Sequence, residues 1–467
     1  MGRNRHYGRL IEDLEIISAG AEGKSIGRWN DKVVFVNYGA PGDIADVKVI
    51  GRKRKYLIGE IVNLKKPSDL RTEPRCQHFG LCGGCKWQHL TYDAQLQLKA
   101  QQVTDSFQRI GKLDFPEPGT ILGSEDTFQY RNKIEYTFSA SRWILQEEAD
   151  KGEHLDKDAV GFHIPGRYDK VLHIDTCHLQ SDPTNAVRKW FFNAAKERNL
   201  SFYNIREHQG LLRNLILRNT VDGQWMVIVI FGADDPARTE LLDAFSAAFP
   251  EIRNVMYVIN TKQNDTIYDL DVEIHKGQDH IIETIGDRKY KIRAKSFFQT
   301  NPRQAKTLYD VTRDFANVQE GEVLYDLYCG TGTIGLYLAE NAAKIVGVES
   351  VEQAIQDAYE NAKMNGVENA VFEVGDMRKV FDSGFIEKHG APHVIVTDPP
   401  RSGMHKDVVD QINQSGAARV VYVSCNVATQ ARDLDLMRDH YRIVKVQPVD
   451  MFPHTHHVEN VVLLQKI

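Results

Sequence analysis

Two apolar runs in the C-terminal part constrain the fold of this chain more than any other feature. The first, His393-Val-Ile-Val-Thr, stops at Asp398-Pro-Pro-Arg401, and the second, Arg419-Val-Val-Tyr-Val-Ser, stops at Cys425-Asn426. Such runs are typical of parallel strands covered on both faces, and parallel sheets bind ligands at the carboxyl ends of their strands. The pattern therefore predicts that a carboxylate and a thiol face one crevice. The alternative is that Asp398 is a turn residue and Cys425 a small buried hydrophobe.

A glycine-rich turn indicates what this crevice binds. Val323-Leu-Tyr-Asp326-Leu-Tyr-Cys-Gly-Thr-Gly-Thr-Ile-Gly predicts a strand, a turn and a helix, and Lys344-Ile-Val-Gly-Val-Glu349 predicts the next strand. The same spacing serves dinucleotides, in which the second acid binds ribose hydroxyls. Because Asp326 and Glu349 both bring negative charge, the pattern favours the sulfonium and amino groups of S-adenosylmethionine. Asp376, after the following strand, is expected to hold the adenine amino group, with helix capping as the alternative for all three acids.

The rest of the chain has different patterns. Residues 9–64 show the short strands and close turns of a small β-barrel, and residues 91–111 show an amphipathic helix with an N-cap Thr and a terminal Gly. Residues 120–275 have mostly the period-two pattern of strands, with one helical stretch. The 467-residue chain is therefore expected to be a multidomain α/β protein, with a β-barrel over 1–68, a central α+β domain over 69–280 and a Rossmann-like domain over 281–467.

Composition and charge indicate location and partners. No apolar run reaches the length of a membrane span, and Met1-Gly-Arg-Asn-Arg-His is not followed by a signal-peptide core, so a cytoplasmic protein is expected. The net charge is -6, yet residues 1–75 carry 15 Lys and Arg against 10 Asp and Glu. Arg52-Lys-Arg-Lys, near two tyrosines, suits phosphate contact and base stacking. Tyr130-Arg-Asn-Lys133 and Arg213-Asn-Leu-Ile-Leu-Arg218 are further candidates for RNA contact, with solvated charge as the alternative.

Three cysteines are bunched in Cys76-Gln-His-Phe-Gly-Leu-Cys82-Gly-Gly-Cys85, and Cys177 stands apart. The spacing predicts a metal or cluster site, because iron-sulfur clusters often take a bunched set of thiolates and one remote thiolate. A zinc site that uses His78 or His89 and unliganded thiols are the alternatives.

The chemistry of the crevice follows from its residue types. The motif at Asp398 resembles that of amino-group methyltransferases, but Arg401 replaces the aromatic residue that stacks on a flipped base, so an exocyclic nitrogen is a poor acceptor. Carbon five of a pyrimidine becomes nucleophilic only after an addition at carbon six, for which a cysteine thiolate is suited. Cys425 meets this need, and the dipole of the helix expected after it would favour the thiolate. Glu459 is the expected base for the proton on carbon five, with His454 and His457 as alternatives.

Taken together, these motifs resemble the RNA 5-methyluridine methyltransferase family over nearly the whole chain, with a barrel that resembles a TRAM domain. The resemblance rests on the four cysteines, Ser296-Phe-Phe-Gln299, the glycine-rich turn, Asp398-Pro-Pro-Arg, Ser424-Cys-Asn-Val and His457-Val-Glu-Asn-Val. It implies that Cys425 is the nucleophile and Glu459 the proton acceptor. It also implies a 4Fe-4S cluster on Cys76, Cys82, Cys85 and Cys177, and a cofactor site lined by Gln299, Tyr328, Thr333, Glu349 and Asp398. Thr333 stands where several members have Asn.

The cluster-bearing branch of that family resembles the 23S ribosomal RNA enzymes more than the tRNA branch. The expected function is therefore methylation of carbon five of a uridine in 23S rRNA, with the uridine flipped into the crevice. Methylation of tRNA uridine by the same chemistry is the alternative. A DNA cytosine methyltransferase and a catalytically inactive RNA-binding or ribosome assembly factor are the alternatives from other classes.

Overall fold

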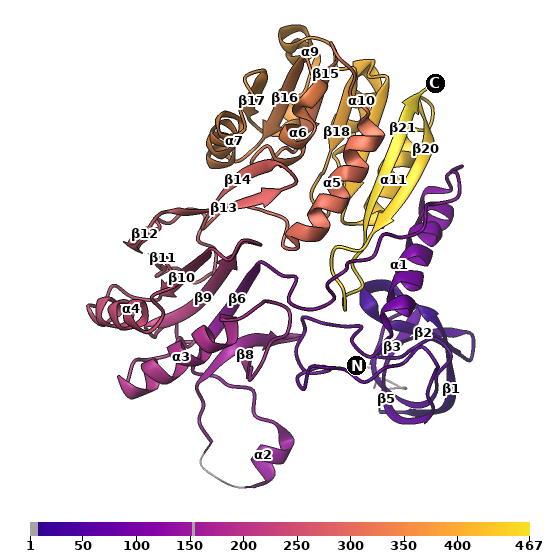
Figure 1. The fold of residues 1–467 in the computed structure, drawn as a ribbon. Helices are drawn as coiled ribbons and strands as arrows, with labels where there is room; N and C mark the ends of the chain where they lie inside the picture. The colour runs from indigo at the N-terminus through magenta and orange to yellow at the C-terminus, as the bar shows by residue number, and fades with distance from the viewer. Residues whose placement is uncertain (1–7, 152–154) are drawn as a thin grey trace. The chain divides into compact units, whose positions relative to one another are not determined.

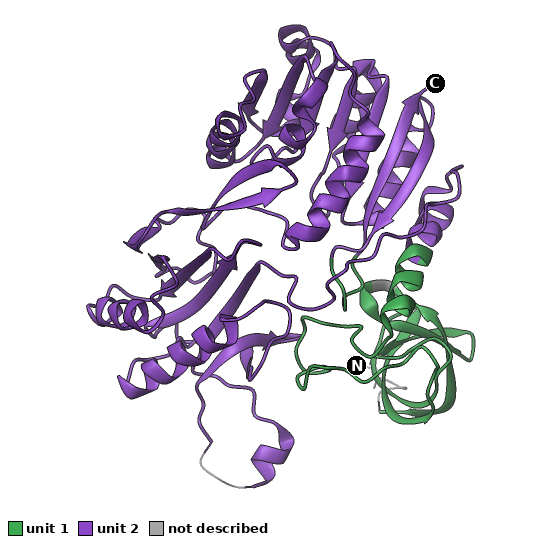
Figure 2. Ribbon diagram, in the orientation of Figure 1, with its two compact units in different colours: residues 1–101, 452–457 green, residues 102–451, 458–467 purple. Residues whose placement is uncertain are grey.

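The computed structural model describes residues 8–151 and 155–467. The expectation that no signal peptide is present rests partly on residues 1–7, which lie outside this range. Two compact units make up the chain: unit 1 is residues 1–101 with 452–457, and unit 2 is residues 102–451 with 458–467 (Figure 2). Compactness does not measure independent folding, so the three domains expected from the sequence remain a prediction.

Unit 1 contains a closed five-stranded barrel, as the sequence predicts. Its core is formed by inward-facing aliphatic side chains such as Ile16, Val34 and Val47, each fully buried. One of its strands, β2 (Ser25–Trp29), has only a weak strand pattern in the sequence, because it contains Gly27. Glycine is required there, since a Cβ on Gly27 would lie 2.9 Å from the carbonyl oxygen of Glu15 on the neighbouring strand. In spatial order the strands are β1 (Leu10–Ala19), β2 (Ser25–Trp29), β3 (Lys32–Asn37), β5 (Tyr56–Lys66) and β4 (Ile44–Arg52), with a short 3-10 turn, η1 (Ala21–Gly23), after β1.

The predicted helix over 91–111 is confirmed, with one change near its end. It begins as α1 (Tyr92–Ser106), where the Thr91 hydroxyl accepts a hydrogen bond from the amide of Ala94 at 3.4 Å. Its last turn widens into a π-helix, η2 (Phe107–Gly111). Within unit 2 this turn packs on α11 (Val427–Met437), where a Cβ on Gly111 would lie 2.7 Å from the carbonyl oxygen of Ala431. Glycine at this position therefore allows close packing of the two helices.

The first sheet of unit 2 is the expected mixed α+β part (Figure 1). Only β10 and β11 are parallel in it. One face packs on α3 (Thr184–Glu197) and α4 (Ala237–Ala248), where the rings of Phe191 and Phe245 stack at 4.7 Å. In spatial order the strands are β12 (Glu273–Lys276), β11 (Asn254–Ile259), β10 (Trp225–Phe231), β9 (Leu212–Asn219), β6 (Lys133–Ser139), β7 (Ala159–Ile164) and β8 (Arg167–His173), and a short helix, α2 (Gln146–Asp150), precedes β7.

Arg213 does not face RNA, contrary to the suggestion from the sequence. Its side chain is 1% exposed, and it donates hydrogen bonds to the carbonyl oxygens of Asn260, Lys262 and Asn264. It also forms an ion pair with Asp265 at 2.9 Å. Arg213 therefore organises the loop after β11.

In the second sheet of unit 2, six strands run in one direction and only the strand Glu459–Lys466 runs against them, and the parallel part is the doubly wound pattern that the sequence predicts. Helices cover both faces: α5, α6 and α7 lie on one, and α9, α10 and α11 lie on the other (Figure 1). In spatial order the strands are β17 (Ala370–Val374), β16 (Lys344–Glu349), β15 (Val323–Leu327), β18 (Val394–Thr397), β19 (Arg419–Ser424), β21 (Glu459–Lys466) and β20 (Tyr441–Val449). The helices are α5 (Pro302–Ala316), α6 (Thr333–Tyr337), α7 (Glu352–Met364), α8 (Met377–Val380), α9 (Ser383–His389) and α10 (Lys406–Ser415), with a 3-10 turn, η3 (Ala339–Asn341).

A hairpin of β13 (His280–Ile285) and β14 (Arg288–Arg293) links the two sheets of unit 2. The side-chain amide of Gln224 both donates to and accepts from the backbone of Ile282, at 3.2 Å in each case. The carboxylate of Glu283, fully buried, accepts hydrogen bonds from the amides of Val221 and Thr284. These contacts hold the hairpin against the turn between β9 and β10.

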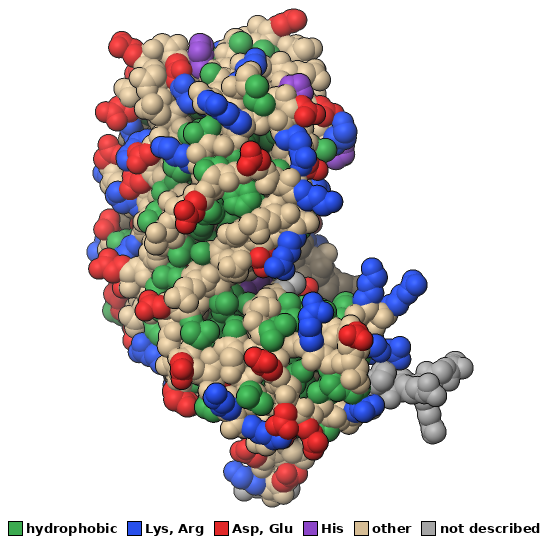
Figure 3. Space-filling model, turned by 90° about the vertical axis from the view of Figure 1, so that its right-hand side faces the viewer, with side chains coloured by type: hydrophobic (Ala, Val, Ile, Leu, Met, Phe, Trp, Pro, Cys, Tyr) green, Lys and Arg blue, Asp and Glu red, His purple; other side chains and the backbone are tan. Residues whose placement is uncertain are grey.

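No helix in the described part of the chain is long and apolar enough to cross a membrane. On the face that Figure 3 shows, acidic and basic side chains are interspersed and hydrophobic side chains lie among them.

Candidate active site

The strand ends named by the sequence meet at one edge of the second sheet of unit 2. Parallel pairing aligns Leu327 of β15 with Thr397 of β18, so the glycine-rich turn and Asp398 leave the sheet side by side. The last strand, β21, runs antiparallel to β19, and Ser424 is paired with Asn460. Cys425 and Glu459 are each one residue beyond that pair, in the same direction along the sheet. The register therefore places the predicted nucleophile opposite the predicted base.

The glycine-rich turn is built around the carboxyl group of Asp326. Its Oδ2 accepts a hydrogen bond from the amide of Gly335 at 2.7 Å, and a Cβ on Gly335 would lie 2.8 Å from the same oxygen. Its Oδ1 is buried and has no hydrogen-bond partner in residues 8–151 and 155–467. Burial raises the pKa of Asp326 to about 7, and the charges of Asp398 and Glu349 act in the same direction. A buried carboxyl oxygen without a partner fits a cationic or hydrogen-bond-donating ligand group, such as the amino group of S-adenosylmethionine.

Glu349, at the end of β16, organises the neighbouring turns. One oxygen accepts a hydrogen bond from the amide of Gly330 at 3.3 Å, and the other accepts from the amides of Ser350 and Val351 at 2.6 and 3.0 Å. The carboxylate thus connects the glycine-rich turn to the segment that precedes α7. Carboxylate oxygens at this place are suited to ribose hydroxyls.

Asp376 is held in the role that the sequence left as its alternative, that of a helix cap. Its Oδ1 accepts from the amide of Arg378 at 3.0 Å at the start of α8, and its Oδ2 lies 2.7 Å from the Arg378 guanidinium. These contacts lower the pKa of Asp376 to about 2. The adenine contact remains a prediction.

The other predicted cofactor residues are held mainly through their backbone. The carbonyl oxygen of Gln299 accepts a hydrogen bond from the side-chain amide of Asn132 at 3.1 Å. Thr333 receives hydrogen bonds from two buried tyrosines, from Tyr290 to its carbonyl oxygen at 3.1 Å and from Tyr309 to its hydroxyl at 3.3 Å. Tyr328, in the glycine-rich turn, adopts a left-handed conformation with φ 65. The two tyrosines thus fix the position of Thr333 at the end of the turn.

The group expected to perform the chemistry contains two carboxyls, a thiol and a guanidinium. Burial raises the pKa of Glu459 to about 8 and that of Asp398 to about 7. Burial also raises the pKa of Cys425 to about 12, with the charges of Glu459 and Asp398 acting in the same direction. Arg401 opposes this rise through its charge and through a hydrogen bond. The four groups therefore interact electrostatically, as a shared crevice requires.

Burial and neighbouring carboxyls oppose the effect on the Cys425 thiolate that the sequence predicts for the following helix. α11 does begin there, with Asn426 as N-cap accepting from the amide of Ala428 at 3.2 Å. The dipole of one helix end is worth about 1 kcal/mol. Burial and the charges of Glu459 and Asp398 raise the pKa of Cys425 against this effect.

Arg401 is the site residue that sequence reasoning underrated, because it was read only as a departure from an aromatic motif. Its carbonyl oxygen accepts hydrogen bonds from the Asn426 side-chain amide at 2.8 Å and from the Thr429 hydroxyl at 3.3 Å. The turn that carries Arg401 is thereby tied to the start of α11, where Cys425 lies. The sequence did contain a signal for this role, because Arg401 is a cationic residue three positions after Asp398, the acid at the end of a predicted strand.

His454, the alternative base, is committed to contacts inside unit 1. Its amide donates to the side-chain oxygen of Gln95 at 2.7 Å, and its Nδ1 lies 3.3 Å from the Gln95 amide nitrogen. Its carbonyl oxygen accepts from the amides of Lys86 and Trp87, each at 2.9 Å. These contacts favour Glu459 as the base.

The predicted cluster ligands are divided between the units, with Cys76, Cys82 and Cys85 in unit 1 and Cys177 in unit 2. Searched over its described residues, the structure shows no group of three or more His, Cys, Asp or Glu side chains that could hold a metal ion. Individual sulfurs do accept backbone hydrogen bonds. Cys82 accepts from the amide of Gly84 at 3.5 Å, and the amides of His78 and Phe79 lower the pKa of Cys76 against the larger effect of burial, which raises it. Such bonds are also found around cluster thiolates.

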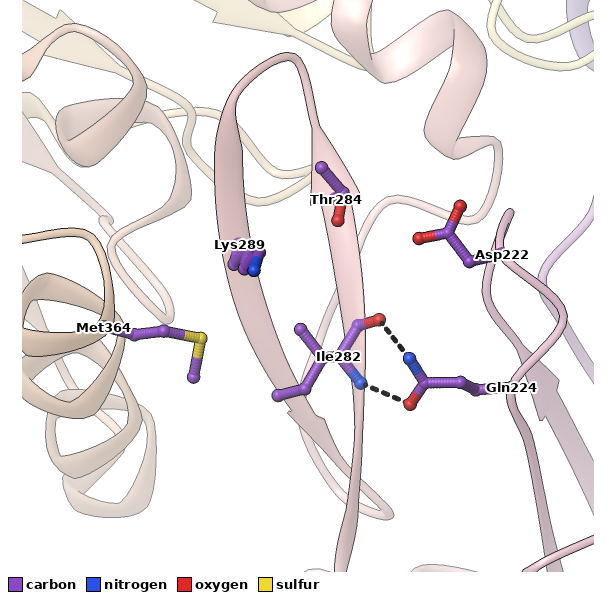
Figure 4. Close-up of a pocket in the computed structure, with 6 residues that line it drawn as sticks. All are labelled: Asp222, Gln224, Ile282, Thr284, Lys289 and Met364. Atoms are coloured by element: carbon purple, nitrogen blue, oxygen red, sulfur yellow. Dashed lines mark hydrogen bonds between the residues drawn. The ribbon is translucent and has the colours of Figure 1, made fainter.

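One cavity lies elsewhere in unit 2, at the hairpin. It has a volume of about 430 Å³ (Figure 4). Its lining residues are Asp222, Gln224, Ile282, Thr284, Lys289 and Met364. None of them was expected at the active site.

The sheet order, the glycine-rich turn and the acids at the strand ends define an S-adenosylmethionine-dependent methyltransferase. Two sequence families match the chain: the tRNA (uracil-5-)-methyltransferase family over residues 269–467 and the TRAM domain over residues 10–62. The chain therefore belongs to the RNA (uracil-5-)-methyltransferase family with an N-terminal TRAM domain, as the sequence indicated, and it is an S-adenosylmethionine-dependent RNA methyltransferase.

Relatives match along the whole length. An RNA methyltransferase of uncharacterized function from Bacteroides thetaiotaomicron is 49% identical, with 95% of this chain and 99% of the relative covered. A similar protein from Chlorobaculum tepidum is 38% identical, with coverages of 98% and 97%. Among solved structures, the Pyrococcus abyssi tRNA (uracil-54, C5)-methyltransferase in complex with S-adenosyl-L-homocysteine has a TM-score of 0.73 and 29% identity, covering 97% of this chain and 100% of that one.

Proposed function

We propose that this protein methylates carbon five of a uridine in 23S rRNA through a covalent adduct between Cys425 and carbon six. The observation that carries the proposal is the register of β19 and β21, which places Cys425 and Glu459 opposite each other at the end of the sheet that carries the glycine-rich turn. A thiol and a buried carboxyl are the two groups that the reaction needs. We also expect the protein to act in the cytoplasm.

S-adenosylmethionine supplies the methyl group when it is bound. The residues suited to hold it are Gln299, Tyr328, Thr333, Glu349, Asp376 and Asp398, together with the unpartnered oxygen of Asp326. Because Asp326, Glu349 and Asp398 are all acids, the crevice favours a cation over the neutral product that remains after methyl transfer.

The residues of this chain perform the remaining steps. Cys425, as thiolate, forms a bond to carbon six of the flipped uridine, and the electron pair displaced to carbon five bonds the incoming methyl. Glu459 then takes the proton from carbon five, the carbon-sulfur bond breaks, and the double bond between carbons five and six forms again. The thiolate is restored, so one methyl replaces one proton. A base with a pKa of about 8 is suited to this transfer near neutral pH.

We expect the purified protein to transfer labelled methyl groups to in vitro transcribed 23S rRNA, and mass mapping to locate the label in 5-methyluridine. The solved structure of a tRNA (uracil-54, C5)-methyltransferase is similar to this chain over most of its length. A pool of tRNA transcripts therefore belongs in the same assay. Label found in tRNA alone would contradict the choice of rRNA and leave the chemistry intact. Label on cytidine or on an exocyclic nitrogen would contradict the chemistry. Retained RNA affinity without transfer to total RNA would indicate the inactive binding factor.

The 4Fe-4S cluster on Cys76, Cys82, Cys85 and Cys177 stays a prediction. We expect protein purified without oxygen to be brown, to absorb near ~400 nm and to contain about four iron atoms per chain. A Cys82→Ser variant should lose this absorption, while Cys329→Ser, which alters a thiol outside the predicted set, should keep it. Colourless protein with one equivalent of zinc would support the zinc alternative instead. The cluster is expected to be structural, because methyl transfer requires no electron.

A further inference from the structure

Two basic residues, one from each of the two stretches that the sequence suggests for RNA contact, are neighbours on adjacent strands of the first sheet of unit 2. Lys133 of β6 is directly opposite Arg218 of β9, and both strands are labelled in Figure 1. Side chains alternate between the faces of a sheet. The next residues, Ile134 and Leu217, belong to the core beneath α3 and α4, so Lys133 and Arg218 lie on the opposite face.

Arg218 is buried without enough partners. It is 5% exposed, and its Nη2 donates to the carbonyl oxygen of Ser296 at 2.6 Å. Its Nε is buried and has no hydrogen-bond partner within the described ranges. Burial lowers the pKa of Arg218 to about 10, while Tyr268 and Glu135 act against the decrease. A buried guanidinium with an unused donor is costly unless an acceptor reaches it.

Positive charge on this face exceeds the nearby negative charge. Burial lowers the pKa of Lys133 to about 8, and the charges of Arg218 and Arg131 lower it further in the same balance. Only Glu135, two residues along β6, raises it. Asp265, which interacts with Glu135, is already paired with Arg213. An added anion would therefore stabilise both cations.

This face adjoins the segment that carries Gln299. Arg218 holds that segment at Ser296, and Asn132, next to Lys133, holds it at Gln299 and at Thr300, where its amide donates to the carbonyl oxygen at 2.8 Å. Tyr268, whose hydroxyl interacts with Arg218, is 70% exposed, which is unusual for a tyrosine. An exposed aromatic ring beside paired cations is the arrangement with which proteins bind single-stranded nucleic acid.

We propose that Lys133 and Arg218 bind a backbone phosphate of the substrate RNA close to the nucleotide that is methylated. The exposed ring of Tyr268 then stacks on an unpaired base beside that phosphate. This inference rests on the proposed function in one respect, that the substrate is RNA. The phosphate contacts Lys133, and the guanidinium of Arg218, opposite Lys133 on the same face, adds a second positive charge beside it. Arg213 takes no part, because its donors are used inside the protein.

The test measures RNA binding, separately from methyl transfer. We expect Lys133→Gln to weaken binding of unmodified 23S rRNA transcript by about 5- to 10-fold at low salt, and to reduce the slope of log affinity against log salt by about 0.7 to 0.9. Lys363→Gln, which removes the same charge from the exposed end of α7, is the matched control and should change neither quantity. Binding of S-adenosyl-L-homocysteine should be unchanged in both variants.

Arg218 provides the second variant. Arg218→Lys keeps the charge and should weaken RNA binding by about 3- to 10-fold, because a lysine cannot present the fork of donors with which Arg218 holds the segment at Ser296. Retained thermal unfolding and S-adenosyl-L-homocysteine binding would show that it folds. Equal affinity and equal salt slope for the wild type, Lys133→Gln and Lys363→Gln would overturn the proposal. Wild-type protein that binds RNA through these residues but transfers no methyl group would overturn the proposed function alone.

Discussion

Replacing Cys425 with alanine is expected to reduce methyl transfer to RNA by on the order of 10⁴-fold or more, because carbon five of uridine has no other route to nucleophilicity in this site. The sulfur follows the last residue of β19 and precedes the N-cap of α11, so alanine removes the nucleophile without disturbing a hydrogen bond of either element. The measurement is single-turnover incorporation of labelled methyl groups into 23S rRNA transcript. Unchanged incorporation would end the covalent mechanism.

Two controls separate loss of chemistry from loss of structure. Cys425→Ser keeps the size and polarity of the side chain, and it should be nearly as inactive, since a hydroxyl is a much weaker nucleophile at neutral pH. Both variants should bind S-adenosyl-L-homocysteine and RNA with wild-type affinity. If the alanine variant binds neither ligand, that substitution has disturbed the crevice, and the comparison must use the serine variant.

Replacing Glu459 with glutamine is expected to leave the first bond-forming steps intact and to block the last one. The methylated adduct cannot lose the proton on carbon five without a base, so protein and RNA should remain joined on a denaturing gel. Turnover should fall by about 10²- to 10⁴-fold, the usual contribution of a positioned base. Glutamine keeps the shape of the buried side chain, which is 4% exposed, and removes only its ability to accept the proton as a carboxylate.

The double variant Cys425→Ala with Glu459→Gln is the control for the adduct, because it lacks the sulfur that would form the bond. It should migrate freely. A Glu459→Gln protein that also migrates freely, yet has lost turnover, would show that Glu459 acts before the adduct forms and would contradict its proposed role. His454→Gln should form no adduct, since His454 is bound by Gln95 within unit 1.

The raised pKa values of Glu459 and Cys425 indicate that both groups need a nearby positive charge before they react. With a pKa of about 8 for Glu459 and about 12 for Cys425, both groups are mainly protonated at pH 7 in the ligand-free protein. A positive charge placed beside Asp398 lowers the pKa of each neighbouring acid and favours the ionised forms. Arg401 already acts in that direction, which gives a physical role to the residue that replaces the aromatic position of the amino-group methyltransferases.

Local patterns predicted the elements well where one kind of residue dominates a stretch. The barrel, the long helix and the strands that end at Asp398 and Cys425 all follow from apolar periodicity and from abrupt strand ends. The strand pattern of β2 is weak because it contains Gly27, and the reason for that glycine lies on a neighbouring strand. The carboxyls that oppose the Cys425 thiolate are likewise absent from its own segment, since Asp398 follows β18 and Glu459 lies in β21.

The sequence by itself determined which residues end each strand, and with them the set of acids, the thiol and the glycines that define a methyltransferase crevice. Only the tertiary structure decided that Glu459 is placed opposite Cys425, that Arg401 is tied to the start of α11 and that Lys133 is next to Arg218. These pairs join residues 25 to 85 positions apart. Their proximity depends on strand register, which is set by burial of whole sheet faces and leaves no mark in the local pattern of either segment.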